Sequence, residues 1–315
     1  MQFNNEKFNI SAVKQDDLFI CAIGYEKRST YIYEKLKAKI KGENIMLLFF
    51  DDYQKNLDSN REIIDLMESD KLQKLFFKYE EGNEVQSAII SFVEKKKSIN
   101  CNIHLDYSSM PRKWYYKLPF ELKNVCKNSN NIYFWYSTGK YEPDYECYPS
   151  AGVESYSIIG KTSLRIDPKR LHVFGLSYDS IRTKALISIL DPDAYITCNA
   201  YNGARQDIGI NVRKKNKEII EQGGNEVTLE IDDFSFMVAK LCEIVNEYLP
   251  LGDVILVPDG PKPLIFAMAL VPQVLQKEGV TCILVSRNQK AYEPIKVSAD
   301  GYIYGFSILA KKINC

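Results

Sequence analysis

The order in which apolar runs and helical patterns alternate constrains this fold more than any other feature of the sequence. Short apolar runs bounded by turn residues alternate with longer stretches whose apolar residues recur every three to four positions. The same series occurs twice along the 315 residues. Such alternation is typical of β-α-β units, in which helices connect parallel strands, so we predict an α/β fold with two mostly parallel sheets.

Each half of the chain supplies five expected strands. In the first half they are Leu18–Ile23, Ile45–Phe50, Leu75–Lys78, Cys101–Leu105 and Asn131–Tyr136; in the second they are His172–Leu176, Ala194–Cys198, Glu226–Glu230, Val254–Val257 and Thr281–Val285. Expected helices include one after the capping box Ser59–Glu62, one over Glu84–Lys95, and others at 181–190, 208–222, 234–248 and 263–277.

Landmarks shared by the two halves recur at a nearly constant offset. The pairs separated by 153 residues are Tyr25-Glu26 with Tyr178-Asp179, and Asp106 with Asp259. Pro111 and Pro263 each open the next expected helix. These matches predict a tandem duplication of Rossmann-like repeats, residues 1–165 and 166–315, each with a five-stranded sheet flanked by helices, forming a pseudo-dimer within one chain.

The composition narrows the classes of function. Lys+Arg 41 and Asp+Glu 41 give zero formal net charge, which disfavours a protein that coats duplex nucleic acid. The eight cysteines form no C-x-x-C pair and only two histidines are present, so we expect no structural zinc and reduced thiols in a cytoplasmic protein. No signal peptide and no apolar stretch of membrane-spanning length is visible, so we expect no membrane partner.

Candidate ligand-binding residues follow the first and fourth expected strands of each half. In an open parallel sheet, ligands bind beyond the carboxyl ends of the strands, near the point where the strand order reverses. Each segment leads into a helix N-terminus, which attracts anions. The candidates are Gly24, Tyr25, Arg28, Ser29, Asp106, Ser108, Ser109 and Arg112 in the first half, and Ser177, Tyr178, Asp179, Arg182, Asp259, Gly260 and Lys262 in the second.

Acidic residues at these strand ends would repel a phosphate. We assign Glu26, Asp106, Asp179 and Asp259 to ribose hydroxyls, base edges, partner cations or a metal; helix capping or a salt bridge to a nearby cation is the alternative for each. Three further candidates follow the second strand of the second half and suit a wall that stacks on a base, although a plain turn explains them nearly as well: Asn199, Asn202 and Arg205.

Other motifs carry little weight. Gly160-Lys161-Thr162 resembles the end of a phosphate-binding P-loop but lacks the first glycine of that motif. His104 and His172 fall on apolar strands, which favours core roles over a Ser-His-Asp triad.

Three charged runs are expected on the surface. Asp51-Asp52 favours a turn cap over a Mg²⁺ site, and Lys95–Lys97 and Arg213–Lys215 favour solvated helix faces over nucleic-acid contacts.

The strand-end segments resemble a known family. Two Rossmann-like modules with paired first-strand and fourth-strand loops, the latter ending here in Pro258-Asp-Gly-Pro-Lys262, resemble the CARF domains of CRISPR-linked effectors and their fused form, the SAVED domain of anti-phage signalling. The resemblance implies binding of a cyclic oligonucleotide or related nucleotide messenger between two copies. Ser108-Ser-Met-Pro-Arg112 departs from the Gly- and Lys-containing turn of that family.

The leading hypothesis is therefore a cytoplasmic sensor in anti-phage defence. It would bind a nucleotide-derived, phosphate-bearing ligand in the groove between the repeats without a cofactor, and signal to a separately encoded effector, because the repeats leave no room for a fused one. The alternative is a nucleotide- or phosphoester-processing enzyme with one active half, in which Glu26 and Asp106 act as general base or ligate Mg²⁺. A scaffold that binds only protein is the third reading.

Overall fold

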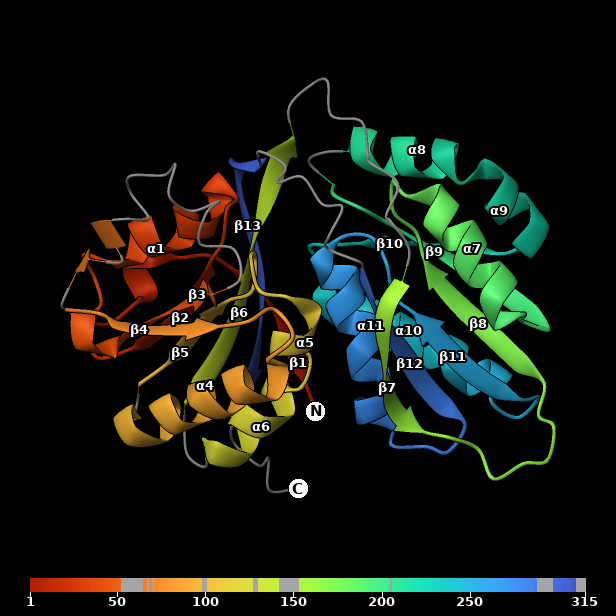
Figure 1. Cartoon of the computed structure of the whole chain (residues 1–315), viewed down its shortest axis with the longest axis horizontal. Coiled ribbons are helices and arrows are strands. Elements are labelled where there is room, and N and C mark those ends of the chain that lie inside the picture. Colours follow the sequence, from red (N-terminus) through yellow and green to blue (C-terminus); the bar gives the residue numbers. More distant parts are fainter. Residues whose placement is uncertain are drawn as a thin grey trace. The chain divides into compact units, whose positions relative to one another are not determined.

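The protein is described by a computed structural model covering residues 1–51, 65–66, 68–69, 71–97, 101–126, 130–141, 153–203, 206–287 and 297–309. It divides into two compact α/β units (Figure 1). Unit 1 comprises Met1–Tyr145 and Pro294–Cys315, and unit 2 comprises Glu146–Glu293. The predicted fold class, two mostly parallel sheets flanked by helices, is confirmed.

Unit 1 is built on a seven-stranded sheet with the order β1-β13-β6-β5-β2-β3-β4. Strands β2 to β6 are mutually parallel, whereas β13 runs antiparallel to β6 and β1 antiparallel to β13. The strands are β1 (Phe3–Lys7), β2 (Leu18–Ile23), β3 (Ile45–Phe50), β4 (Gln73–Phe77), β5 (Ile103–Asp106), β6 (Asn131–Tyr141) and β13 (Val297–Leu309). The helices are η1 (Ile10–Ala12), η2 (Lys27–Thr30), α1 (Tyr31–Leu36), η3 (Gly42–Asn44), α4 (Gly82–Lys96), α5 (Arg112–Tyr115) and α6 (Leu118–Val125).

Burial on both faces explains the continuous apolar runs of β2 and β3, in which every residue is buried. Phe19 and Leu47 belong to one core cluster with Ile32 and Leu36 of α1, so α1 covers one face of the sheet. The other face is covered by α4, α5 and α6 (Figure 1).

Unit 2 is built on a six-stranded sheet with the order β10-β9-β8-β11-β12-β7. Its strands are β7 (Val153–Lys161), β8 (Arg170–Gly175), β9 (Ala194–Tyr201), β10 (Glu226–Glu230), β11 (Asp253–Val257) and β12 (Val280–Arg287). Its helices are α7 (Ser180–Leu190), α8 (Gln206–Lys215), α9 (Lys217–Gly223), α10 (Phe234–Tyr248) and α11 (Lys262–Leu275). Strands β8 to β12 are parallel and β7 runs antiparallel to β12.

The two sheets share one topology. Counting strands within each repeat, both read third, second, first, fourth, fifth, with a sixth, antiparallel strand beside the fifth. The sixth strands also pair alike: Leu309 of β13 lies opposite Asn131 at the start of β6, and Lys161 of β7 lies opposite Val280 at the start of β12.

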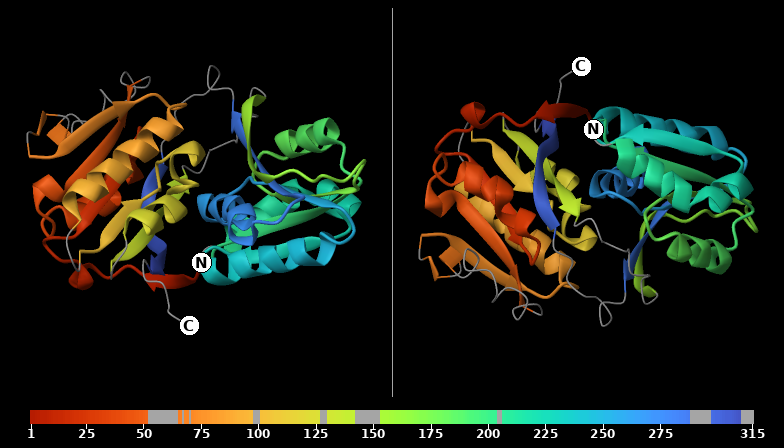
Figure 2. Two further views of the ribbon diagram at one scale, coloured as in Figure 1. Left: turned by 90° about the horizontal axis from the view of Figure 1, so that it is seen from below. Right: turned by 90° about the horizontal axis from the view of Figure 1, so that it is seen from above.

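The sixth strands are exchanged between the units. β7 follows β6 along the chain but pairs in the sheet of unit 2, whereas β13 follows β12 but returns to the sheet of unit 1. Figure 2 shows β13, in blue, among the red-to-yellow strands of unit 1. The expected boundary between residues 165 and 166 is therefore wrong, because β7 lies before it and completes unit 2, and β13 lies after it and completes unit 1.

Three strands were not expected, namely β1, β7 and β13, so the five strands expected per sheet become seven and six. β1 (FNNEK) is mostly polar. The partners of β7 and β13 lie more than 100 residues away, where no local pattern points to them. The expected helix at 208–222 is divided at Asn216 into α8 and α9, and the expected capping box Ser59–Glu62 lies outside the described residues.

Candidate functional site: the carboxyl edges of the two sheets

Each sheet has one point at which the strand order reverses. In unit 1 it lies between β2 and β5, and in unit 2 between β8 and β11. In folds of this class the loops that leave such a pair of strands form the ligand crevice. Most of the predicted site residues lie on these four loops.

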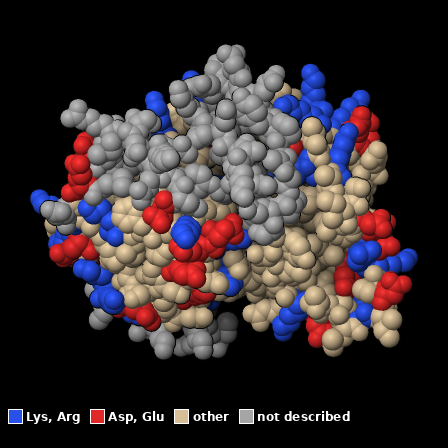
Figure 3. Space-filling view, viewed as in Figure 1, with Lys and Arg blue, Asp and Glu red and all other residues tan. Residues whose placement is uncertain are grey.

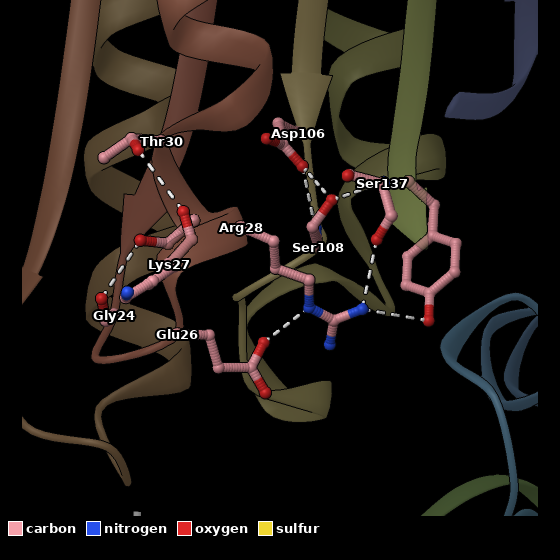
Figure 4. Close-up of polar contacts among 10 residues, drawn as sticks. Gly24, Glu26, Lys27, Arg28, Thr30, Asp106, Ser108 and Ser137 are labelled. Carbon is pink, nitrogen blue, oxygen red and sulfur yellow. Dashed lines mark hydrogen bonds and ion pairs between the residues drawn. The ribbon is translucent and has the colours of Figure 1, made fainter. Parts of the chain in front are cut away.

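Arg28 is the centre of the polar contacts in unit 1, although its side chain is buried (Figure 4). Its Nε donates to Oε2 of Glu26 at 2.6 Å, and its Nη1 donates to the carbonyl of Ser137 at 3.1 Å and to the hydroxyl of Tyr136 at 3.3 Å. The guanidinium also lies 5.6 Å from the centre of the Tyr136 ring. Arg28 thus ties the loop after β2 to strand β6, and Glu26 is its counter-ion.

Asp106, the last residue of β5, orders the second loop of unit 1. Its Oδ1 accepts hydrogen bonds from the backbone N–H of Ser108 at 2.9 Å and from the Ser108 hydroxyl. That hydroxyl in turn accepts from the N–H of Ser137 at 2.7 Å. The carboxylate therefore fixes the loop against β6 by closing a turn with Ser108; it does not cap α5, whose N-cap is Pro111.

The two loops of unit 1 meet at Gly24 and Ser109. The carbonyl of Gly24 accepts a hydrogen bond from the Ser29 hydroxyl at 3.0 Å, and an ideal Cβ built on Gly24 would lie 3.7 Å from Cβ of Ser109. The Ser109 hydroxyl oxygen is buried without a hydrogen-bond partner among the described residues. Tyr25, next to Gly24 in the chain, and Arg112, the first residue of α5, are half-buried.

A cluster of tyrosines lies under the same edge and was missed by sequence reasoning. Tyr107, Tyr115 and Tyr136 are buried, with ring centres of Tyr107 5.3 Å from Tyr115 and 5.7 Å from Tyr136. Burial raises the pKa of Tyr115, and the charge of Arg112 partly opposes that shift. The high tyrosine content, 21 residues, was the only signal in the sequence.

Unit 2 carries a different arrangement, a buried ion pair. The guanidinium Nη2 of Arg182 pairs with Oδ2 of Asp259, and both side chains are almost completely buried. Ser177 donates its hydroxyl to the same carboxylate oxygen at 2.8 Å and accepts from the N–H of Asp179 at 3.1 Å. Asp179 is the N-cap of α7, accepting from the Arg182 N–H at 3.0 Å.

The loop after β11 in unit 2 depends on Gly260. Its φ is +93°, and a Cβ there would lie 2.4 Å from the Leu176 carbonyl oxygen, so only glycine fits. Pro261 is the N-cap of α11 and Lys262 its first residue, just as Pro111 is the N-cap of α5 and Arg112 its first residue. The proline equivalent to Pro111 is thus Pro261 rather than the expected Pro263.

Asp106 and Asp259 are not structurally equivalent. Asp106 lies within the sheet, opposite Cys21 of β2, whereas Asp259 follows Val257, which lies opposite Phe174 of β8. Since Cys21 and Phe174 are separated by the 153-residue offset, the equivalent of Asp106 is Val257. Asp259 is two residues further along, and the expected pairing of the two aspartates is wrong.

Further contacts at this edge involve Asn216 and Lys215, which sequence reasoning did not place in the site. Asn216 is buried and donates through Nδ2 to the carbonyls of Ser177 and Val212, each at 2.8 Å. Nζ of Lys215 lies 5.5 Å from the ring centre of Tyr178. An asparagine within an expected helix is a signal for a cap or a break, and it could have identified Asn216.

Two of the three residues of the predicted base-binding wall in unit 2, Asn199 and Asn202, lie in the described part of the chain. Asn199 is buried on β9 and donates to the carbonyl of Gly209 at 3.2 Å, so it holds α8 against the sheet. Asn202 is buried at the end of the same strand. Arg205 lies outside the described residues, as does Asp52 of the expected Asp51-Asp52 pair.

Both histidines are buried within the sheets, His104 on β5 and His172 on β8. His104 interacts with Asp17 and Trp135, and His172 stacks on Phe174. Within the part of the chain that the structure describes, no three His, Cys, Asp or Glu side chains are grouped as a metal site would require.

The described surface carries mixed charge. Basic and acidic side chains are interspersed on the face shown in Figure 3. Among the described helices, none has the length and apolarity needed to cross a bilayer.

Comparison with known proteins adds little. No family profile matches the chain, and no similar sequence is found among curated proteins. The cytoplasmic domain of a prokaryotic cation chloride cotransporter aligns with 85% of this chain and 95% of its own length, at 11% identity and a TM-score of 0.23. A likeness at that score carries no argument, so the function must be argued from the residues.

Proposed function

We propose that this protein is a cytoplasmic sensor that binds a nucleotide-derived, phosphate-bearing ligand at the carboxyl edges of its sheets and signals to a separate partner protein. The observation that carries the proposal is that both units place a buried arginine, Arg28 or Arg182, at the reversal point of the strand order. That point is where sheets of this class bind ligands.

Cations on the other loop of each unit's pair also support an anionic ligand. Arg112 and Lys262 are the first residues of equivalent helices, and both are half-buried at the carboxyl edge of their sheet. In unit 2, Lys262 lies at the start of a 14-residue helix whose N-cap, Pro261, makes no side-chain cap hydrogen bond. The N–H groups and dipole of such a helix end favour a phosphate.

The acidic residues do not oppose this binding as strongly as their number suggests. Glu26 is paired with Arg28, Asp179 caps α7, and Asp259 is paired with Arg182. Each carboxylate is thereby neutralised or ordered within its own unit. The same contacts weigh against the enzyme alternative, because a general base at Glu26 would first have to leave its ion pair.

Differential scanning fluorimetry against mononucleotides, dinucleotides and cyclic oligonucleotides tests the proposal. We expect at least one phosphate-bearing member to raise the melting temperature, and its nucleoside without phosphate to raise it less. Flat curves across the whole panel would refute it. Chromatography after incubation with Mg²⁺ or Mn²⁺ tests the enzyme alternative, for which Asp106→Asn should abolish product formation.

A further inference from the structure

We propose that the exchanged strand β13 is part of the candidate ligand site of unit 1, where Val297 acts as a positioning residue for the guanidinium of Arg28. The role in ligand affinity rests on the proposed function, whereas the placement of Arg28 can be tested without any ligand.

The first observation is that Arg28 is held on the side of β6. Its Nη1 bonds the carbonyl of Ser137 and the hydroxyl of Tyr136, so the guanidinium lies along the last residues of that strand. Those residues precede Tyr141, which lies opposite Val297 at the start of β13.

The second observation is the close approach of three residues at Gly139. An ideal Cβ built there would lie 2.4 Å from Cγ1 of Val297 and 3.1 Å from Nη1 of Arg28. Both atoms therefore approach the space beside Gly139 that any larger residue would fill. Val297 is itself buried, so the position of its side chain beside Gly139 is fixed by packing, and its proposed role is to limit the space open to the guanidinium.

The third observation is a register shift in β13 between Ala299 and Ile303, where Gly301 has a φ of +100°. Asp300 within this irregular stretch accepts a hydrogen bond from the Thr138 hydroxyl. β-Bulges commonly re-aim side chains beside functional sites. The start of β13 is thus anchored to the end of β6 at Val297 and at the residues that follow it.

Chemical modification of arginine in the intact chain measures the placement directly. We expect phenylglyoxal, read out by peptide mass spectrometry, to modify Arg28 several-fold faster in Val297→Ala and in Gly139→Ala than in the wild type. In the double variant Gly139→Ala/Val297→Ala the severe clash with Cγ1 is gone, so the rate should fall below that of Gly139→Ala.

Gly305→Ala is the matched control. Gly305 also lies on β13, and a Cβ there would lie 2.3 Å from the Trp135 ring, so the variant disturbs the same strand pair through Trp135 and leaves Gly139 and Val297 unchanged. It should lower the melting temperature without changing the rate at Arg28. Modification of Arg28 at the wild-type rate in Val297→Ala, or an equal increase in Gly305→Ala, would overturn the proposal.

Calorimetric titration with inorganic pyrophosphate then links placement to binding. Val297→Ala should weaken pyrophosphate binding several-fold and Gly305→Ala should not; equal affinity in both would overturn the role in binding. If pyrophosphate binds neither the wild type nor any variant, the proposed function fails for this site, while the modification rates still decide the position of Arg28.

Discussion

Trp135 donates its indole N–H to Nδ1 of His104 at 3.1 Å, and this hydrogen bond determines which imidazole nitrogen carries the proton. An indole nitrogen only donates, so Nδ1 is the acceptor and Nε2 bears the hydrogen that faces Oδ2 of Asp17 at 3.3 Å. Asp17, His104 and Trp135 thus form a closed structural chain at the amino edge of the sheet, with no ring nitrogen left for proton transfer to a substrate.

Asp17→Asn should change how stability depends on acid. Burial alone would raise the pKa of Asp17, but hydrogen bonds from His104 and from the N–H groups of Lys14 and Asn102 hold it below 3.8. Its contribution is therefore complete above pH 3.8 and is lost as the pH falls through the folded-state pKa. Urea unfolding between pH 3 and pH 6 should show the gap between wild type and variant narrowing at the acid end; a constant gap would contradict this.

His172 should reduce the free energy of unfolding as the pH falls from 6.5 towards 4, a higher range of pH than that in which Asp17 acts. Burial, aided by the Arg170 charge, lowers the pKa of His172 from 6.5 to about 4. The unfolded chain binds the proton more tightly, so this contribution is complete above pH 6.5 and is lost on acidification towards pH 4, by up to about 3 kcal/mol. His172→Phe, which keeps a ring stacked on Phe174, should flatten the unfolding free energy between pH 6.5 and pH 4.5, whereas Asp17→Asn should not.

The buried ion pair of unit 2 should show strong coupling in a double-mutant cycle. Arg182→Ala leaves Asp259 buried without its cation, and such changes typically cost about 3–5 kcal/mol. Removing both partners should cost clearly less than the sum of the two single variants, because no charge is left unpaired. Denaturant titration of the four proteins measures the coupling, and strict additivity would mean that the pair does not form in solution.

Arg112→Ala and Lys262→Ala should each weaken a ligand identified by the nucleotide panel. A charge-assisted hydrogen bond is worth about 1.5–3 kcal/mol, which corresponds to roughly 10- to 150-fold in affinity. Stability should change by less than about 1 kcal/mol, since neither residue is fully buried. Arg112→Lys should also lose affinity where recognition is bidentate.

Calorimetry on both single variants and on the double variant separates two outcomes of that experiment. Loss of binding in both single variants means that cations of both units contribute. If one substitution abolishes binding and the other leaves it unchanged, the ligand occupies one unit only.

Deletion of the C-terminal segment that contains β13 should unfold unit 1 rather than remove one strand from a sheet that stays folded. Val297 and residues 305–308 of β13 are buried, Phe306 stacks on Phe134 at 4.8 Å, and among the described strands β1 pairs with β13 alone. Both tryptophans, Trp114 and Trp135, lie in unit 1, so their fluorescence reports on that unit alone. Truncation before Val297 should give the emission of exposed tryptophan; a blue-shifted, native-like spectrum would show that β13 is dispensable.

The strands that were predicted correctly are those whose burial on both faces produces a continuous local run of apolar residues. The runs LFICAI and IMLLFF are apolar throughout because both faces of β2 and β3 are covered, and their bounds were found without error. Strands β7 and β13 could not be found in this way, because their pairing depends on which repeat they join and that choice has no local pattern. The constant offset of 153 residues also led to the wrong pairing of Asp106 with Asp259. The equivalent strand end in unit 2 comes two residues earlier, at Val257.

The exchange of sixth strands also determines which sheet can be completed first while the chain is being synthesised on the ribosome. Unit 2 is contiguous, so it can complete its sheet as soon as β12 has emerged, whereas the sheet of unit 1 stays open beside β6 until residues 297–309 are made. The half that is synthesised first is therefore finished last. A nascent chain that stalls anywhere in unit 2 would present an unpaired β6 edge, which makes that edge the place where chaperones or misassembly would act.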